Sequence, residues 1–460
     1  MLGLLGLVLS LLALMYLAYK GVNVLVLAPV CALFAILFQP EAFSAPGVPV
    51  AMYTQVFMVA LGKYLMKYFP IFLLGAIFGK LMNDTQCARV IGETISNKLG
   101  AKHAILASVL AASILTYGGV SLFVVAFCVF PISLTLFARA GVDKKFIPAC
   151  IALGSFTFTM TALPGSPAIP NALPMPYFGT TTFAAPGLGI IGSIVILACG
   201  IAWLKYRTRH SVLPENLSEE DDFVGKKPSF LLALTPLLIV MVGNFVFSEI
   251  VIAGWEAPYL ATPKFGSVDI QGVKGLWAII ISVTLAILFV LVFLRSYSNQ
   301  MIDSINKGTM GSLLPIFNTA SEVGYGAIIA SLASFAVLRD MVVNISPGNP
   351  IISVAVAINL LAGITGSASG GLSIGLEVLG AKYLEMAQAA NISPELLHRV
   401  AAMSSGGLDA LPHNGAVISL LAICGLTHKE SYFDVFMSST VVTLIGTIVV
   451  VILGSMFGSF

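Results

Sequence analysis

The sequence predicts an all-α polytopic membrane protein with two inverted-topology repeats, each containing a re-entrant helical hairpin and a broken transmembrane helix. Three observations support this prediction. Of the 460 residues, 58% are hydrophobic and 10% charged, with a mean hydropathy of +0.98, whereas soluble domains carry about 25% charged residues. Apolar stretches of membrane-spanning length fill most of the chain. Polar interruptions within these stretches recur in the same order in both halves.

This composition excludes several classes of protein. So much apolar surface cannot be hidden inside a water-soluble core, which argues against a soluble enzyme or a nucleic-acid-binding module. The net charge of +2 identifies no charged partner. The six cysteines form no CxxC pair, so neither a disulfide framework nor a metal site is expected. We expect a multi-pass membrane protein, with the lipid bilayer as its surroundings and no cofactor.

Continuous apolar stretches give the simplest spans, because about 20 such residues cross a bilayer. They lie near residues 1-19, 22-38, 68-82, 185-204, 229-248, 273-294, 313-338 and 433-457. Two amphipathic segments, 53-67 and 296-311, are expected at the membrane interface.

Four further apolar stretches are interrupted. Glycine and serine in the middle of 104-138 and 350-390 predict hairpins. Proline and glycine in 146-182 and 395-426 predict broken helices, whose freed backbone groups must be buried in protein or line a wet cavity.

An internal repeat relates the two halves. Three motifs recur about 250 residues later: Pro70-Ile71-Phe72 as Pro315-Ile316-Phe317, Gly118-Gly119 as Gly370-Gly371, and Ala162-Leu163-Pro164 as Ala410-Leu411-Pro412. The acidic, hydrophilic segment between the halves is the expected linker. The predicted organisation is therefore a first repeat over 1-204, a cytoplasmic linker over 205-228 and a second repeat over 229-460.

Broken helices that meet at the membrane midplane are typical of secondary transporters, and their half-helix N-termini favour anions such as carboxylates. The candidate substrate-binding residues are the glycine, proline and polar residues of the four interruptions: Thr116, Tyr117, Gly118, Gly119, Ser121, Pro164, Gly165, Ser166, Asn171, Ser367, Ser369, Gly370, Gly371, His413 and Asn414. The alternative is that glycine and serine here only let helices pack closely.

Ionisable residues at membrane depth are functional candidates. Asp409, His413 and Glu322 are the candidate proton-coupling residues, because a buried carboxyl or imidazole group can load and release a proton. The alternative is that each forms a hydrogen bond that fixes a helix break. Arg399 and Lys382 are expected to extend toward the membrane surface.

The hairpin and breaker motifs, together with the segments 391-397 and 406-415, resemble the gluconate permease (GntP) family of the ion transporter superfamily over nearly the whole chain. The resemblance implies proton-coupled uptake of small organic acids by an inner-membrane carrier. The superfamily implies a homodimer in which a transport domain moves against a scaffold. Sugar-acid members carry a His-Val-Asn-Asp-like cluster in the second broken helix, whereas here His413-Asn414 follows Asp409. This difference places the sequence closer to permeases for short hydroxy acids such as 3-hydroxybutyrate.

We therefore expect a secondary active transporter that imports a small organic acid, a hydroxy-carboxylate or a sugar acid, by proton symport with an elevator-type mechanism. No catalytic residues are expected. The alternatives are a sodium-coupled carboxylate transporter, a channel, and a membrane-embedded enzyme with Asp409 and His413 as acid and base. The chain has no GxxxxGK[ST] motif, which argues against an ATP-driven pump.

The distribution of basic residues predicts the orientation. The positive-inside rule places Lys144 and the linker in the cytoplasm and the 339-349 loop outside, if the hairpins return to their own side. A cysteine introduced as Lys144→Cys should therefore resist a membrane-impermeant maleimide on intact cells and react after permeabilisation. Asn344→Cys, as the matched control, should react in intact cells. Labelling of Lys144→Cys from outside would contradict the hairpin topology.

Overall fold

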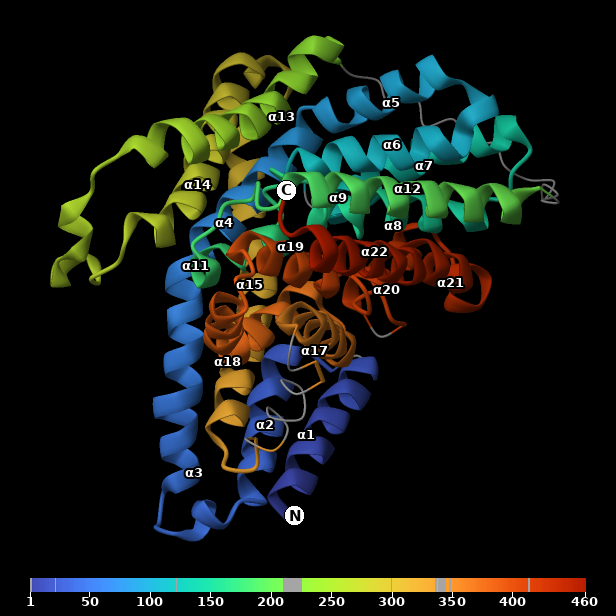
Figure 1. Cartoon of the computed structure of the whole chain (residues 1–460). Helices are drawn as coiled ribbons and strands as arrows, with labels where there is room; N and C mark the ends of the chain where they lie inside the picture. Colours follow the sequence, from blue (N-terminus) through green and yellow to red (C-terminus); the bar gives the residue numbers. More distant parts are fainter. Residues whose placement is uncertain are drawn as a thin grey trace.

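The chain folds into helices that are joined by turns and short irregular segments (Figure 1). The structure is a computed structural model, which describes residues 2–20, 22–120, 122–209, 226–298, 300–335, 337, 345–346, 349–412 and 414–460. These residues contain no strand, which confirms the all-helical prediction. Ser121, His413 and most of the expected linker lie outside the described residues.

The first half begins with two helices that form an antiparallel pair and ends with a long closing helix. Its main helices are α1 (Leu2–Tyr19), α2 (Val24–Leu37), α3 (Val48–Ala51), α4 (Met58–Asp84), α5 (Cys87–Leu99), α6 (Ala104–Tyr117), α7 (Leu122–Ala140), α8 (Ile147–Ser155), α9 (Phe158–Thr161), α10 (Ile169–Ala172), α11 (Met175–Phe178) and α12 (Pro186–Thr208). The hairpin predicted over 104-138 is formed by α6 and α7, and the break predicted within 146-182 lies between α8 and α12.

The second half repeats this order. Its main helices are α13 (Phe230–Phe245), α14 (Ile270–Phe293), α15 (Met301–Ser331), α17 (Pro350–Thr365), α18 (Ala368–Ala389), α19 (Pro394–Ser405), α20 (Gly415–Ile423), α21 (His428–Phe436) and α22 (Val442–Phe457). The predicted hairpin over 350-390 is formed by α17 and α18, and the second break separates α19 from α20. Among the described residues, five helices are individually long and apolar enough to cross a membrane.

The two long helices α4 and α15 pack against each other in opposite directions. Ser304 Oγ, near the start of α15, donates a 2.6 Å hydrogen bond to Asp84 at the end of α4. Further along α15, a side chain added at Gly324 would meet the ring of Phe57, just before α4 begins. Because α4 and α15 are corresponding helices of the two repeats, their antiparallel packing fits the inverted relation between the halves.

The amphipathic segments predicted over 53-67 and 296-311 are not separate interfacial helices. A π-helical segment, Met52–Phe57, joins α3 to α4, so that the helix runs for 37 residues from Val48 to Asp84. Such a helix is about 55 Å long, which exceeds the roughly 30 Å of the hydrocarbon core. Similarly, α15 starts at Met301 within the second segment. Both helices continue past the nearby prolines, Pro70 in α4 and Pro315 in α15, so neither proline separates the amphipathic segment from the apolar stretch.

Each N-terminal helix pair packs on the long helix of the opposite repeat. The α1–α2 pair contacts α15, and the α13–α14 pair contacts α4, so the two pairs lie at different ends of the molecule (Figure 1). Ser10 Oγ donates a 2.7 Å hydrogen bond to the Cys31 carbonyl and lies 3.1 Å from the Tyr325 hydroxyl of α15. The hairpins and broken helices occupy the space between the pairs, and the closing helices α12 and α22 pack against each other.

A buried arginine joins the second repeat to the first. Arg399 of α19 is 0% exposed. Its Nε donates to Ala184 O (3.0 Å), its Nη1 to Thr161 O and Asn171 Oδ1 (both 3.0 Å), and its Nη2 to Thr182 O (3.1 Å) and Ala184 O (2.8 Å). These five bonds use all five N–H groups of a guanidinium. We refer to Arg399 and these four acceptor residues as the arginine clamp.

The arginine clamp corrects the expectation that Arg399 extends toward the membrane surface. Three of its acceptor residues, Thr161 at the end of α9 and Thr182 and Ala184 in the irregular chain before α12, provide carbonyls that have no helical partner. His398 strengthens the same contact, because its Nδ1 lies 2.7 Å from Thr180 Oγ1 and its Nε2 lies 3.3 Å from Asn171 Oδ1. The first broken helix is therefore held in place by a helix of the second repeat.

Loss of the guanidinium should destabilise the whole protein. Arg399→Leu would leave several buried carbonyls without a donor, and should lower the free energy of unfolding by about 3 kcal/mol or more. Arg399→Lys should have an intermediate effect, because an ammonium has three N–H groups in place of five. Thermal denaturation of the purified protein in detergent measures both effects.

Lys382→Ala is the matched control for these variants. Lys382 forms a 3.0 Å ion pair with Glu385, and the two side chains are 47% and 69% exposed. Such surface pairs contribute at most about 1 kcal/mol, so the control should melt within about 2 °C of the wild type. An Arg399→Leu protein with an unchanged melting temperature would show that the arginine clamp is not a structural requirement.

Candidate functional site

The two helix breaks lie next to each other. In the first repeat, regular α-helix ends at Ser155, and Thr157 has φ −116° and ψ −119°. In the second repeat, α19 ends at Ser405. A Cβ added at Gly406 would lie 3.1 Å from Thr161 Cγ2. The arginine clamp spans the same junction, so both the packing and the hydrogen bonds bring the breaks together.

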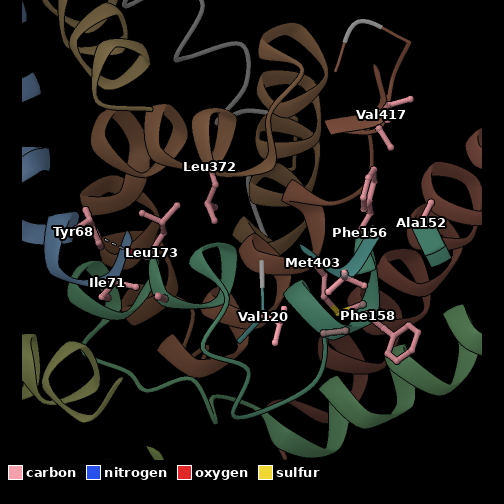
Figure 2. Close-up of a cluster of buried hydrophobic side chains, with 14 of the residues drawn as sticks. Tyr68, Ile71, Val120, Ala152, Phe156, Phe158, Leu173, Leu372, Met403 and Val417 are labelled. Carbon is pink, nitrogen blue, oxygen red and sulfur yellow. Dashed lines mark hydrogen bonds between the residues drawn. The ribbon is translucent and has the colours of Figure 1, made fainter. Parts of the chain in front are cut away.

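Apolar side chains fill the space around the breaks (Figure 2). Phe156 and Phe158 flank the first break, and Met403 precedes the second; all three are buried. Leu173 lies near Tyr68, whose hydroxyl donates a 3.2 Å hydrogen bond to the Leu173 carbonyl. The polar groups that the structure describes at the breaks are therefore surrounded by apolar side chains, which form an interior of low dielectric constant.

The tip of the first hairpin contacts the first break. Thr116 Oγ1 donates to Ser155 Oγ at 2.8 Å, and Tyr117 Oη donates to Pro164 O at 2.6 Å. Gly119 has a φ of +90°, which favours glycine, and a Cβ there would lie 3.2 Å from Pro167. The structure thus brings Thr116, Tyr117, Gly119 and Pro164 together. Gly118 lies instead against Leu237 of α13.

Three other predicted residues form the interior of the first break. Asn171 Nδ2 donates to Ser166 O (2.9 Å) and Thr182 O (3.0 Å), while its Oδ1 accepts from Arg399. Gly165, with φ +82°, donates its N–H to Thr182 O at 2.9 Å. Its carbonyl accepts a 3.1 Å bond from Asn244 Nδ2 of α13. The amide of Asn171 is therefore fully engaged in holding the break.

The tip of the second hairpin is formed by Gly366 and Ser367. Gly366 has φ +63°, and Ser367 caps α18 by accepting a 3.0 Å hydrogen bond from the Gly370 N–H. Ser369 Oγ lies 3.4 Å from Ser367 Oγ and 3.5 Å from Thr319 Oγ1 of α15. Ser369 thus extends its hydroxyl from the tip toward α15, whereas the Ser367 hydroxyl caps α18.

The glycine pairs of the two hairpins occupy different positions. Gly118 and Gly119 lie at the turn between α6 and α7, whereas Gly370 and Gly371 lie inside α18. A Cβ at Gly371 would collide with the backbone of α17 at Ala362, and one at Gly370 would collide with the Glu322 carboxylate. In the second hairpin, the glycines therefore allow close approach of neighbouring elements.

The second break contains a buried carboxylate, Asp409, one oxygen of which has no hydrogen-bond partner. Asp409 is 6% exposed, and its Oδ1 accepts no hydrogen bond. Its backbone carbonyl accepts a 2.7 Å bond from Asn414 Nδ2. Asn414 also caps α20, because its Oδ1 accepts from the N–H groups of Ala416 (2.6 Å) and Val417 (3.0 Å). Asn359 of α17 lies against Gly407 and leaves a second buried oxygen, its Oδ1, without a donor.

Glu322 lies at a different contact, between α15 and α18. It is 3% exposed, and its Oε2 has no hydrogen-bond partner. The structure therefore places the two predicted carboxylates on different elements, Asp409 in the second break and Glu322 in a long helix.

Sequence interpretation missed Arg399 and Asn359 as parts of this region. Arg399 follows the start of a broken helix and precedes a run of small residues, which is a signal for a charge that faces protein rather than lipid. Asn359 is the one amide in the apolar stretch 350-365, and polar residues in such stretches commonly bond across helices.

Comparison with known proteins identifies relatives of this architecture. No protein-family model matches the chain. The Alcanivorax borkumensis YdaH transporter has a similar fold, with a TM-score of 0.54, 12% identity and coverage of 87% of this chain and 88% of that one. Neisseria gonorrhoeae MtrF, which is described within a class of antimetabolite efflux pumps, has a TM-score of 0.54, 13% identity and coverage of 86% and 83%.

A much closer similarity in sequence is found in Bacillus subtilis (strain 168). The protein named there as an uncharacterized transporter, YxjC, is 40% identical over 454 residues, which cover 94% of each chain. At this identity and coverage, the two proteins share their family as well as their fold. The chain therefore belongs to the family of membrane transporters that includes YxjC of Bacillus subtilis.

Proposed function

We propose that the chain is a secondary active transporter that imports a small organic acid by proton symport, in the manner of the gluconate permease family. The substrate is a hydroxy-carboxylate such as 3-hydroxybutyrate, or a sugar acid. The single observation that supports proton coupling best is the buried carboxylate of Asp409 beside the second helix break, whose Oδ1 has no hydrogen-bond partner.

The energetics of Asp409 explain why a proton suits this position. An ionised carboxylate without a partner costs several kcal/mol to bury. A second negative charge, brought by an organic acid to the same break, would raise that cost further. A proton on Asp409 removes both penalties, so proton and substrate would each increase the affinity of the other by the same factor.

The substrate carboxylate has a suitable environment at the start of α20. This helix begins at Gly415, and the N-terminus of a helix favours an anion. Asn414 caps two of its N–H groups and would have to share them with the ligand. His413 precedes this cap in the sequence and remains a candidate for both substrate and proton binding.

The packing suggests which parts move. Each hairpin packs on the broken helix of its own repeat, α6 on α8 and α17 on α19, and the arginine clamp joins the two breaks. We propose that these elements move together as a transport domain against a scaffold that contains α4 and α15, in an inner-membrane homodimer.

Two alternatives have specific support. Sodium could replace the proton, because the breaks are rich in carbonyl and hydroxyl oxygens. Export could replace import, because MtrF is described as an efflux pump, and elevator-type carriers run in the direction of their gradients. One assay should therefore measure both the direction of transport and the identity of the coupling ion.

Proteoliposomes test the proposal directly. Radiolabelled 3-hydroxybutyrate or gluconate should accumulate when the outside is more acidic than the lumen, and an ionophore that collapses the proton gradient should abolish accumulation. Substrate binding should tighten as pH falls, by up to about tenfold per pH unit for one coupled proton. Uptake that follows a sodium gradient and ignores the proton ionophore would overturn proton symport.

Substitution of the proposed carrier separates binding from coupling. Asp409→Asn imitates the protonated residue, so it should keep substrate exchange while it loses uphill accumulation and pH dependence. His413→Gln should behave in this way instead if the imidazole carries the proton. Asp303→Asn is the control, because Asp303 forms a half-exposed ion pair with Lys307 on α15. Full proton-driven accumulation by both Asp409→Asn and His413→Gln would exclude these residues as carriers.

A further inference from the structure

A group of buried oxygen atoms without hydrogen-bond partners lies where α4, α15 and α18 meet. Its members are Tyr64 Oη of α4, Asn318 Oδ1 and Glu322 Oε2 of α15, and Ser373 Oγ of α18. Three of these side chains are at least nine-tenths buried: Tyr64 is 5%, Glu322 3% and Ser373 2% exposed. We refer to these four residues as the Glu322 cluster.

The packing of α15 against α18 brings the cluster together. The two helices run in parallel here, with Thr319 beside Ser369, Glu322 against Gly370, and Gly326 beside Ile374. Asn318 precedes Glu322 by four residues and Ser373 follows Gly370 by three, so each pair shares a helix face. Tyr64 of α4 lies near both Ser373 and Glu322.

Gly370 creates the space for the carboxylate. A Cβ at this position would collide with Glu322 Oε2. The carboxylate is therefore pressed against the backbone of α18, and the hydroxyls of Ser373 and Tyr64 lie further along the same interface. No lysine or arginine among the described residues forms an ion pair with Glu322.

Such a cluster is unusual, because more than nine-tenths of buried polar groups in proteins have partners, and a bound proton or cation would explain it. A proton on Glu322 would neutralise the carboxylate and satisfy one neighbouring oxygen. A cation would neutralise the same charge and bind carboxylate, amide and hydroxyl oxygens at once, which are the hard ligands that alkali and alkaline-earth ions prefer.

We propose that the Glu322 cluster binds one monovalent alkali cation. The single carboxylate of the cluster favours an ion with one positive charge. The described residues contain no group of three His, Cys, Asp or Glu side chains that could hold a metal ion of higher charge. The bound ion would connect the second limb of the second hairpin to both long helices. This inference goes beyond the proposed function, because it depends neither on Asp409 nor on the identity of the substrate.

Thermal denaturation of the purified wild type in detergent tests the site without a substrate. Samples contain sodium, lithium or potassium chloride, or choline chloride at equal ionic strength. A ligand that binds only the folded state stabilises it, so at least one alkali salt should raise the melting temperature saturably, by about 2 °C or more, relative to choline. Equal melting in all four salts would overturn the proposal and would show that Glu322 is satisfied by a proton alone.

Matched variants locate the effect. Glu322→Gln removes the charge and should abolish the alkali-dependent shift, while Ser373→Ala and Tyr64→Phe should weaken it by raising the salt concentration needed for half of the shift. Glu385→Gln, at an exposed site on α18, and Asp409→Asn should both keep the wild-type shift.

The variants also separate this proposal from proton symport at Asp409. A full alkali-dependent shift in Glu322→Gln, or in both Ser373→Ala and Tyr64→Phe if Glu322→Gln does not fold, would place the ion elsewhere and overturn the inference. Loss of the shift in Asp409→Asn would likewise assign the ion to the second break. Neither result would affect the proton-gradient measurements.

Discussion

The structure depends on one constraint: backbone groups that leave a helix inside a membrane protein must find partners within the protein. The first break leaves backbone carbonyls without helical partners from the end of α9 to the start of α12. Arg399 of the other repeat donates hydrogen bonds to the carbonyls of three residues there. The breaks can lie at the centre of the protein because one guanidinium offers five donors in a fixed plane.

The duplicated glycine motifs occupy different structural positions in the two repeats. In the first hairpin, a glycine pair forms the turn and meets the break through Tyr117 and Pro164. In the second, the corresponding pair lies within α18 and lets that helix approach α17 and the Glu322 side chain. Only the first break is held by an arginine among the described residues. Such asymmetry would suit the proposed transporter, in which the two halves bind different groups.

The two buried carboxylates with an unpartnered oxygen lie in different parts of the fold, one at a helix break and one on a long helix. Asp409 belongs to the second break, within the elements proposed to move, whereas Glu322 lies at their contact with the scaffold. Under the two proposals, a proton at the first position would favour substrate binding, and a cation at the second would hold α18 to α4 and α15. Occupancy of the two sites would then control substrate binding and movement separately.

The sequence by itself determined the helical class, the duplication, both hairpins and both breaks, because these follow from apolar length and from the local effects of glycine and proline. It also made Asp409 and Glu322 candidates for a functional role, since carboxylates are rare in apolar stretches. The continuity of α3 with α4, the burial of Arg399 and the placement of Gly370 and Gly371 inside α18 were decided only by the tertiary structure. Each depends on residues far away in the chain: a guanidinium that would extend to water from an isolated helix stays buried here because carbonyls more than two hundred positions away accept its hydrogen bonds.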